Sequence, residues 1–323
     1  MHPKGTCSPG GSLARALAFL GLAACGSPTM MQHGDDDDVA GDAALGSDSG
    51  GSDSDAQISA TCDGKTAQPL DSDWSLTVGS LTRTARVHVP ASYDPSKRTP
   101  LVINLHGRTS NASQQAWLSH AIAKSDAAGF IVIHPEAWGS PTSWNAGGGC
   151  CDPAASNNID DSGFMTAVLD EAEARLCVDP TRIFFEGLSN GGYLVHRVAC
   201  ELTDRVGAIG AVAGLLQLPT CAPTKPMPVF LVHGTADQLV SYDWVDETVS
   251  YWVAKNHCTT TATTYQNGVA TCVTHGGCTD GADVVLCTMQ GGGHQWPGGE
   301  TVPFLGNNSN DLIATDALWD FFV

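Results

Sequence analysis

Ser189 stands between two glycines in the stretch EGLSNGGYLV, residues 186–195. A serine hydroxyl is a poor nucleophile at neutral pH unless a neighbouring base takes its proton. The glycines at positions 187 and 191 allow a tight turn between a strand and a helix, and such a turn lifts the hydroxyl above a sheet. The apolar run RIFFEG ends just before the serine, and a helical pattern starts just after it. This order predicts a nucleophile elbow at Ser189, rather than a surface turn in which the serine only hydrogen-bonds locally.

A nucleophilic serine in such an elbow needs an acid and a histidine, and both are expected to follow it in the chain. Asp237 lies in the loop after the apolar run MPVFLVHG, and His294 lies in a glycine-rich loop after the run ADVVLCTMQG. If both runs are strands of one parallel sheet, these side chains reach the same sheet edge as Ser189. The sequence therefore predicts a triad in which Ser189 attacks, His294 carries the proton and Asp237 orients the imidazole.

Other acids and histidines compete for these two roles. Asp243 and Asp246 lie inside or at the start of the next helical pattern, so we expect them to point away from the sheet edge. His106 and His233 also lie at strand ends, but His106 precedes the serine and His233 precedes the acid, so chain order argues against both. His275 is expected to be a solvated histidine in a loop.

The negative oxygen of a tetrahedral intermediate needs two hydrogen-bond donors that are already in place. In a nucleophile elbow, one donor is the backbone N–H after the nucleophile, here Asn190, and the other comes from the loop after an earlier strand. The run PLVINLHG ends directly before Arg108, so the N–H of Arg108 is the second candidate. This chemistry requires no metal and no organic cofactor.

Two tryptophans flank the motifs. Trp144 and Trp296 have the size and shape to stack on an aromatic acyl group or on a sugar ring. Packing of a loop against the core explains both equally well. They are therefore candidate substrate-binding residues with a structural alternative.

Short apolar runs bounded by turn residues recur along the chain, and most are continuous rather than alternating. Such runs are expected when helices cover both faces of a parallel sheet. The expected strands are 85–90, 100–107, 129–137, 181–187, 206–214, 227–234 and 282–291. The expected helices are 113–128, 164–176, 192–204, 244–257 and 311–323. Asp161 or Ser162 can cap the second of these helices. We predict an α/β fold with a mostly parallel, doubly wound sheet.

Composition and charge limit the class of protein. A chain of 323 residues with 42% hydrophobic residues is large enough for one α/β domain with a tail. The formal net charge of −19 would repel the phosphates of nucleic acid, and no cluster of Lys or Arg offsets it. We therefore expect no nucleic-acid partner.

The first residues predict export. Lys4 and Arg15 precede the short apolar stretch ALAFLGLAA, 16–24, which is too short to span a bilayer. Its end, LAAC, resembles the cleavage site of bacterial lipoproteins, in which the cysteine, here Cys25, carries the lipid. An ordinary signal peptide is the alternative. Residues 26–56 are rich in Asp, Gly and Ser and predict a disordered, acidic tether.

The chain is thus divided into a lipoprotein-type signal peptide, 1–25, the tether, and a catalytic domain, 57–323. We expect an exported protein that is lipid-anchored to the bacterial cell envelope or secreted. Ten of the 12 cysteines lie in the catalytic domain, and in an exported chain this even number predicts five disulfides rather than a metal cluster. Four cysteines crowd one Thr/Gly-rich segment and are expected to pair among themselves: Cys258, Cys272, Cys278 and Cys287.

The motifs resemble those of one family of secreted esterases, the polyhydroxybutyrate depolymerases and bacterial feruloyl esterases. The matching stretches cover nearly all of 80–323 in family order, and they are PLVINLHG, GFIVIHPE, WNAGGGCCDPAASNNIDDSGF, CVDPTRIFFEGLSNGGYLVHRVACE, VFLVHGTAD, GGGHQWPGG and DLIATDALWDFF. The resemblance implies an α/β-hydrolase with Ser189 as nucleophile, Asp237 as acid and His294 as base. Many members have Cys or Gly where this chain has Arg108, so the shape of the pocket beside the oxyanion donors is expected to differ.

We therefore expect an exported serine carboxylic ester hydrolase that works through an acyl-enzyme. The expected substrates are feruloyl or acetyl esters of plant polysaccharide, or short hydroxyalkanoate esters. Crystalline polyester is less favoured, because depolymerases that act on it often carry a separate binding domain, for which we expect no room in this chain. Two alternatives stay open, namely a peptidase on the same triad and a non-catalytic surface protein that binds polysaccharide with the same fold.

Overall fold

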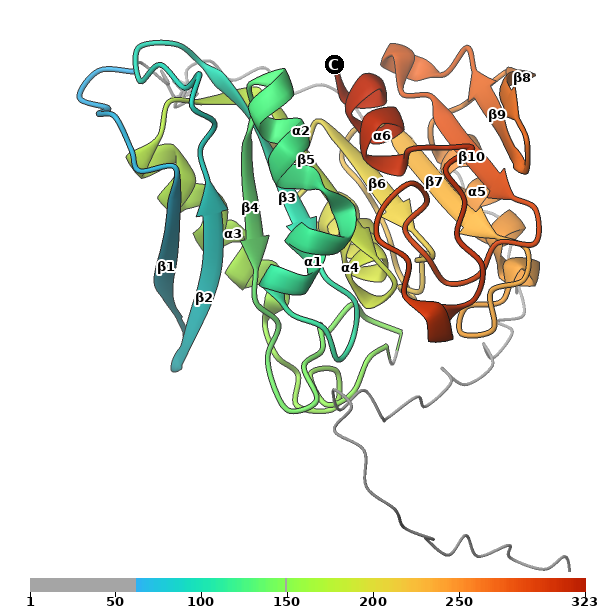
Figure 1. Ribbon diagram of the computed structural model, residues 1–323, viewed down its shortest axis with the longest axis horizontal. Helices are drawn as coiled ribbons and strands as arrows, with labels where there is room; N and C mark the ends of the chain where they lie inside the picture. Colours follow the sequence, from blue (N-terminus) through green and yellow to red (C-terminus); the bar gives the residue numbers. More distant parts are fainter. Residues whose placement is uncertain (1–61, 149) are drawn as a thin grey trace, which may run out of the picture.

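The computed structural model describes residues 62–148 and 150–323, which form a ten-stranded sheet with helices on both faces (Figure 1). The strand order is β1-β2-β4-β3-β5-β6-β7-β10-β9-β8. The predicted signal peptide, the lipid-bearing Cys25 and the tether all lie outside the described residues. They stay predictions.

Six neighbouring strands in the middle of the sheet run parallel, and all six were predicted. They are β4 (Ile131–Pro135), β3 (Thr99–Leu105), β5 (Val178–Leu188), β6 (Ala208–Val212), β7 (Val229–Gly234) and β10 (Val284–Met289). Nearly every residue of these strands is buried, which explains why their sequences are continuous apolar runs. The predicted α/β class with a mostly parallel sheet is confirmed.

Antiparallel hairpins complete both ends of the sheet. At one end β1 (Asp71–Val78) pairs with β2 (Leu81–His88), which pairs with β4. At the other end β9 (Ala270–Gly276) pairs with β10 and with β8 (Thr260–Asn267). Only the second half of β2 was predicted among these four strands.

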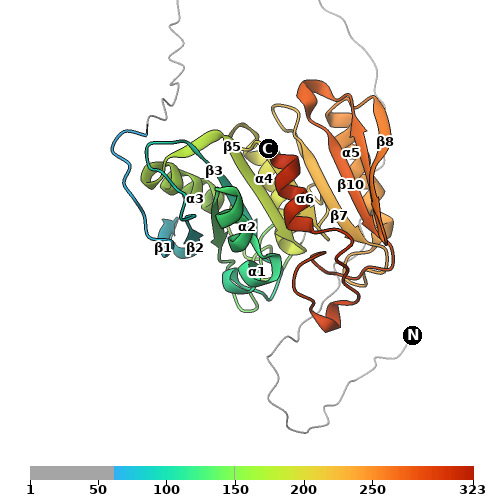
Figure 2. The same cartoon turned by 45° about the horizontal axis from the view of Figure 1, so that its top comes forward.

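In the described part of the chain, three helices pack on each face of the sheet, and they form two apolar cores with it. One face carries α3 (Asp161–Arg175), α4 (Asn190–Glu201) and α5 (Val245–Lys255). The other face carries α1 (Ala112–Ser119), α2 (Ala121–Ala128) and α6 (Ala314–Phe322), which lie together in Figures 1 and 2. Short 3-10 turns occur at Thr203–Arg205, Tyr242–Trp244, Thr279–Gly281 and Pro303–Leu305.

Two details of the helices differ from the predictions. The segment 113–128 is two helices rather than one, because His120 between them has a left-handed φ of 57°. The cap of α3 is Asp160, whose carboxylate accepts the N–H of Gly163 at 2.8 Å. The cap therefore precedes the two predicted residues, which belong to the first turn of the helix.

All ten cysteines of the described residues form disulfides, as predicted. The four in the Thr/Gly-rich segment pair among themselves, and the full set is Cys62–Cys177, Cys150–Cys151, Cys200–Cys221, Cys258–Cys278 and Cys272–Cys287. Five disulfides are typical of proteins from oxidising compartments outside the cytosol. Within the described ranges, no group of three or more His, Cys, Asp or Glu is placed to hold a metal ion. In the same part of the chain, every helix is too short or too polar to cross a bilayer.

Candidate active site

Strand β5 and helix α4 meet at Ser189, which has a φ of 55° and a ψ of −122°. Residues other than glycine rarely adopt a positive φ, and they do so mainly where the surrounding structure imposes this backbone conformation. The N–H of Ser189 donates to the carbonyl of Val212 at 2.8 Å, and its own carbonyl accepts the N–H of Tyr193 at 2.9 Å. The turn is thus held by β6 on one side and by the first turn of α4 on the other.

The two glycines of the motif allow the strand and the helix to approach each other. A Cβ atom at Gly187 would lie 2.6 Å from the backbone carbonyl carbon of Gly191. A Cβ atom at Gly191 would lie 2.4 Å from the carbonyl oxygen of Leu105 in β3. Because both positions exclude a side chain, the glycine spacing follows from the packing of this turn.

Asp237 follows β7 and His294 follows β10, and these strands are neighbours in the sheet. His294 Nδ1 lies 2.7 Å from Asp237 Oδ2, and both side chains are buried. The other carboxylate oxygen accepts the N–H groups of Leu239 and Val240 at 2.8 and 2.9 Å. Since a carboxylate only accepts, Nδ1 carries the proton, and Nε2 of the neutral ring is the nitrogen that can take one up.

The charge of Asp237 follows from these contacts. Burial by itself would raise the pKa of its carboxyl. The hydrogen bond and charge of His294, together with the N–H groups of Leu239 and Val240, outweigh burial and hold the pKa below its usual value. The carboxylate is therefore ionised at neutral pH, and it can stabilise an imidazolium.

The third predicted residue, Ser189, directly follows β5, at the same carboxyl edge of the sheet as Asp237 and His294. In the part of the chain that the structure describes, no hydrogen bond joins Ser189 Oγ to His294 Nε2. In many hydrolases this contact is long until a substrate binds. The structure thus joins two of the predicted residues directly and places the third at the same edge.

The competing acids and histidines have other hydrogen-bond partners, although His233 Nε2 also lies 3.5 Å from Asp237 Oδ2. Asp243 and Asp246 are exposed, in the 3-10 turn before α5 and in its first turn. His275 lies on β9, where its Nδ1 is 3.1 Å from Thr261 Oγ1. His233 donates from Nε2 to the carbonyl of Val240 at 2.8 Å.

His106 is a structural residue at the end of β3. It is buried, its Nε2 accepts the N–H of Ala137 at 3.0 Å, and its Nδ1 donates to the carbonyl of Gly107 at 2.7 Å. Burial lowers the pKa of His106 to about 4, so the ring is neutral at physiological pH. The neutral ring fixes the loop that leads to Arg108.

The first oxyanion candidate, Asn190, begins α4. Its backbone N–H belongs to the first turn, where no carbonyl of the helix can accept it. Its buried side chain accepts the N–H of Trp144 at 2.7 Å and donates to the carbonyl of Trp144 at 3.1 Å. These two bonds fix the start of the helix against the loop that contains Trp144.

The second oxyanion candidate, Arg108, follows a residue that lies beside the nucleophile. A Cβ atom built on Gly107 would be 3.3 Å from the Cβ of Ser189. The side chain of Arg108 turns to the neighbouring loop, where its Nε donates to the carbonyl of Asp152 at 2.9 Å. The backbone directly before Arg108 thus lies beside Ser189, and the role of the Arg108 N–H stays a prediction.

The sequence left two roles open for the two candidate tryptophans, substrate binding and packing, and their burial favours packing. Trp144 and Trp296 are 0% exposed. Their indole N–H groups donate to the carbonyl of His106 at 2.8 Å and to Thr315 Oγ1 at 2.9 Å. Both rings pack inside the protein and offer no face to a ligand, so the structural alternative holds.

Sequence reasoning missed several groups that position the site. Arg83 Nη2 lies 2.8 Å from Asp161 Oδ1, and both side chains are buried. Asp161 Oδ2 also accepts the N–H of Asn145, beside Trp144, at 2.7 Å. The side-chain amide of Asn190, which bonds to the backbone of Trp144, also positions this loop. Asp161 and Asn190 both lie in stretches that match the esterase family, but the spacing of residues in a sequence does not reveal which side chains meet in the fold.

Residues 90–275 match the model of a family described as phospholipase/carboxylesterase. The chain belongs to this family. The phospholipase/carboxylesterase assignment agrees with the α/β-hydrolase fold that was predicted, and it places the chain among hydrolases of the esterase type.

The relatives of this chain include an acetylxylan esterase and a feruloyl esterase. The chain is 25% identical over 214 residues to the bifunctional acetylxylan esterase/xylanase of Neocallimastix patriciarum, covering 64% of this chain and 30% of the relative. It is 28% identical over 230 residues to feruloyl esterase B of Piromyces equi, covering 64% of this chain and 42% of that relative. The chain thus spans less than half the length of either relative. The predicted similarity to feruloyl esterases is confirmed.

A solved structure supports the fold. The acetyl xylan esterase from Aspergillus awamori superposes with a TM-score of 0.57 at 16% identity, covering 69% of this chain and 94% of that chain. At this identity the likeness shows the architecture alone.

Proposed function

We propose that the protein is a serine carboxylic ester hydrolase that works through an acyl-enzyme. The observation that carries the proposal is the 2.7 Å hydrogen bond between His294 Nδ1 and Asp237 Oδ2, at the sheet edge where Ser189 occupies a strained turn. An oriented imidazole backed by an ionised carboxylate is the arrangement that activates a serine hydroxyl.

In the proposed mechanism, Ser189 Oγ attacks the ester carbonyl carbon while its proton passes to His294 Nε2. Asp237 stabilises the imidazolium, and the backbone N–H groups of Asn190 and Arg108 bind the negative oxygen. When the intermediate collapses, the carbon–oxygen bond to the alcohol breaks and the alcohol takes the proton from His294. Water then attacks the acyl-enzyme with the same histidine as base and releases the carboxylic acid.

We propose feruloyl or acetyl esters of plant polysaccharide as the substrates, with short hydroxyalkanoate esters as the second choice. The names of the relatives, an acetylxylan esterase and a feruloyl esterase, support the first choice. The proposed export of the protein agrees with this choice, because such polymers lie outside the cell. Five disulfides favour export, and the cysteine at the end of the apolar stretch, Cys25, is the proposed site of lipid attachment.

Ester hydrolysis by wild-type protein and by Ser189→Ala tests the proposal. The substrates are 4-nitrophenyl acetate, methyl ferulate, acetylated xylan and polyhydroxybutyrate film. We expect Ser189→Ala to lower kcat by roughly a thousandfold or more, while the exposed Ser75→Ala retains full activity. Activity that survives Ser189→Ala would exclude the mechanism. Peptide cleavage without ester cleavage would favour a peptidase, and xylan binding without any hydrolysis would favour a surface-binding protein.

A further inference from the structure

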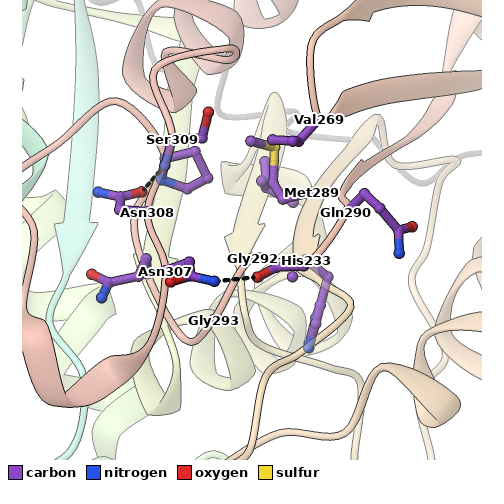
Figure 3. A pocket seen from close by; sticks show the side chains of 14 residues that line it. His233, Val269, Met289, Gln290, Gly292, Gly293, Asn307, Asn308 and Ser309 are labelled. Carbon is purple, nitrogen blue, oxygen red and sulfur yellow. Dashed lines mark hydrogen bonds between the residues drawn. The ribbon is translucent and has the colours of Figure 1, made fainter.

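A pocket of about 270 Å³ lies against the loop that carries His294 (Figure 3). Glycines 291–293 precede the histidine and Gln295 follows it, and all four residues line the pocket. The other walls come from the end of β7, from the turn between β8 and β9, and from the segment 307–309. The pocket is therefore built around the backbone on both sides of His294.

The walls combine apolar surface with neutral polar groups. Figure 3 shows Val269 and Met289 facing Ser309 across the pocket, and Pro297 also lines it. Among the described residues that line it, there is no Asp, Glu, Lys or Arg. A volume just below the roughly 300 Å³ at which small-molecule sites usually begin suits a single small ring. His233 also lines the pocket, and burial lowers the pKa of its ring, so the lining favours a neutral ligand over a charged one.

Several lining groups have hydrogen-bonding capacity that the fold does not use. The hydroxyl of Ser309 accepts the N–H of Asp311 at 3.1 Å, which leaves its proton to donate. Asn307 Nδ2 donates to the carbonyl of Gly291 at 3.1 Å, which leaves its Oδ1 to accept. Gln290 is exposed beside them. A sugar ring has an apolar face of C–H groups and a rim of hydroxyls, and it matches this combination.

The reaction chemistry indicates which part of an ester would lie here. His294 returns its proton to the leaving alcohol, so the alcohol portion of the substrate must lie next to this histidine. We propose that the pocket binds a sugar ring of the polysaccharide that forms the alcohol portion of the ester. The proposal rests on the proposed ester hydrolysis, and it assigns the sugar rather than the acyl group to this pocket.

Binding of an unesterified sugar tests the pocket without any catalytic step. Xylotriose and arabinose are titrated into Ser189→Ala protein by NMR or calorimetry. We expect binding of at least one of them in the millimolar range, and we expect Val269→Trp to weaken it by roughly tenfold or more by filling the pocket. Val269 is 38% exposed in a turn, so it tolerates a larger side chain. Leu70→Trp adds the same indole at an exposed position next to the opposite edge strand, and it should leave binding unchanged.

Hydrolysis separates this inference from the proposed function. The wild-type protein should have a higher kcat/KM for a feruloylated or acetylated xylo-oligosaccharide than for methyl ferulate or 4-nitrophenyl acetate, and Val269→Trp or Ser309→Ala should reduce that preference. Turnover of the sugar-free ester shows that each variant is folded. If no ester is hydrolysed, the proposed function fails. If esters are hydrolysed but neither sugar binds, or Val269→Trp leaves binding unchanged, the pocket assignment is overturned.

Discussion

At the scale of single residues, Asp237 controls which nitrogen of His294 carries a proton. An amide in place of the carboxylate can donate to Nδ1, which turns the ring to the tautomer that cannot take a proton from Ser189. The variant Asp237→Asn should therefore lower kcat by about a thousandfold to ten-thousandfold, with a much smaller effect on KM. The exposed Asp243→Asn is the control. A loss of less than tenfold in Asp237→Asn, measured with 4-nitrophenyl acetate, would assign the acid to another residue.

Glu186 gives a second prediction at this scale, because it is buried three residues before Ser189. Asn104 Nδ2 donates to its Oε1 at 2.5 Å, and burial raises the pKa of Glu186 from 4.5 to about 8. Between these two pH values the native protein keeps the proton while the unfolded chain releases it. The carboxyl therefore destabilises the native state increasingly as the pH rises from about 4.5 to about 8.

The variant Glu186→Gln removes this titration and keeps an acceptor for Asn104. Its melting temperature relative to wild type should rise between pH 5 and pH 8, by several degrees in total. The exposed Glu247→Gln should show no such trend. An equal difference between Glu186→Gln and wild type at both pH values would mean that Glu186 is ionised in the native protein.

At the scale of elements, the loop between β4 and α3 is held against the site by a buried ion pair. Arg83 of β2 and Asp161 of α3 have side chains that are 3% and 0% exposed. Replacement of Arg83 by Leu leaves the carboxylate buried without its partner, which costs about 3–5 kcal/mol of unfolding free energy. Arg86 on the same strand pairs with Asp73 in an exposed geometry, so Arg86→Leu should cost about 1 kcal/mol or less.

Urea unfolding of the two variants measures this difference. Because Asp161 also accepts the N–H of Asn145, Arg83→Leu should lower ester hydrolysis as well as stability. Equal losses of stability in Arg83→Leu and Arg86→Leu would show that the pair does not anchor the loop.

The edge hairpins show which elements the sequence analysis missed. Strand β8 is exposed along its whole length, so it has no apolar run or alternation to detect. The signal that was present is Gly268 between two β-branched stretches, since glycine at the first central position favours a two-residue hairpin turn, and the pairing of Asn267 with Ala270 leaves Gly268 and Val269 as the turn. The break of the helix at His120 had no such signal, because neither glycine nor proline marks it.

At the scale of the whole molecule, chain order was sufficient to find the catalytic candidates. Ser189, Asp237 and His294 each follow a buried parallel strand, and parallel strands bring their carboxyl ends to one edge. The burial of Trp144 and the pocket beside Val269 could not be found in this way. Both depend on loops from distant parts of the chain whose conformations are set by tertiary contacts.

Covalent labelling of the nucleophile is the most direct test of the central claim, that Ser189 forms the acyl-enzyme. The protein is incubated with an aryl phosphonate ester or phenylmethylsulfonyl fluoride, and the adduct is located by peptide mass spectrometry. We predict one adduct per chain, on Ser189, formed in step with the loss of ester hydrolysis and much more slowly in Asp237→Asn. An adduct on another residue, or ester hydrolysis that persists after Ser189 is fully labelled, would contradict the account.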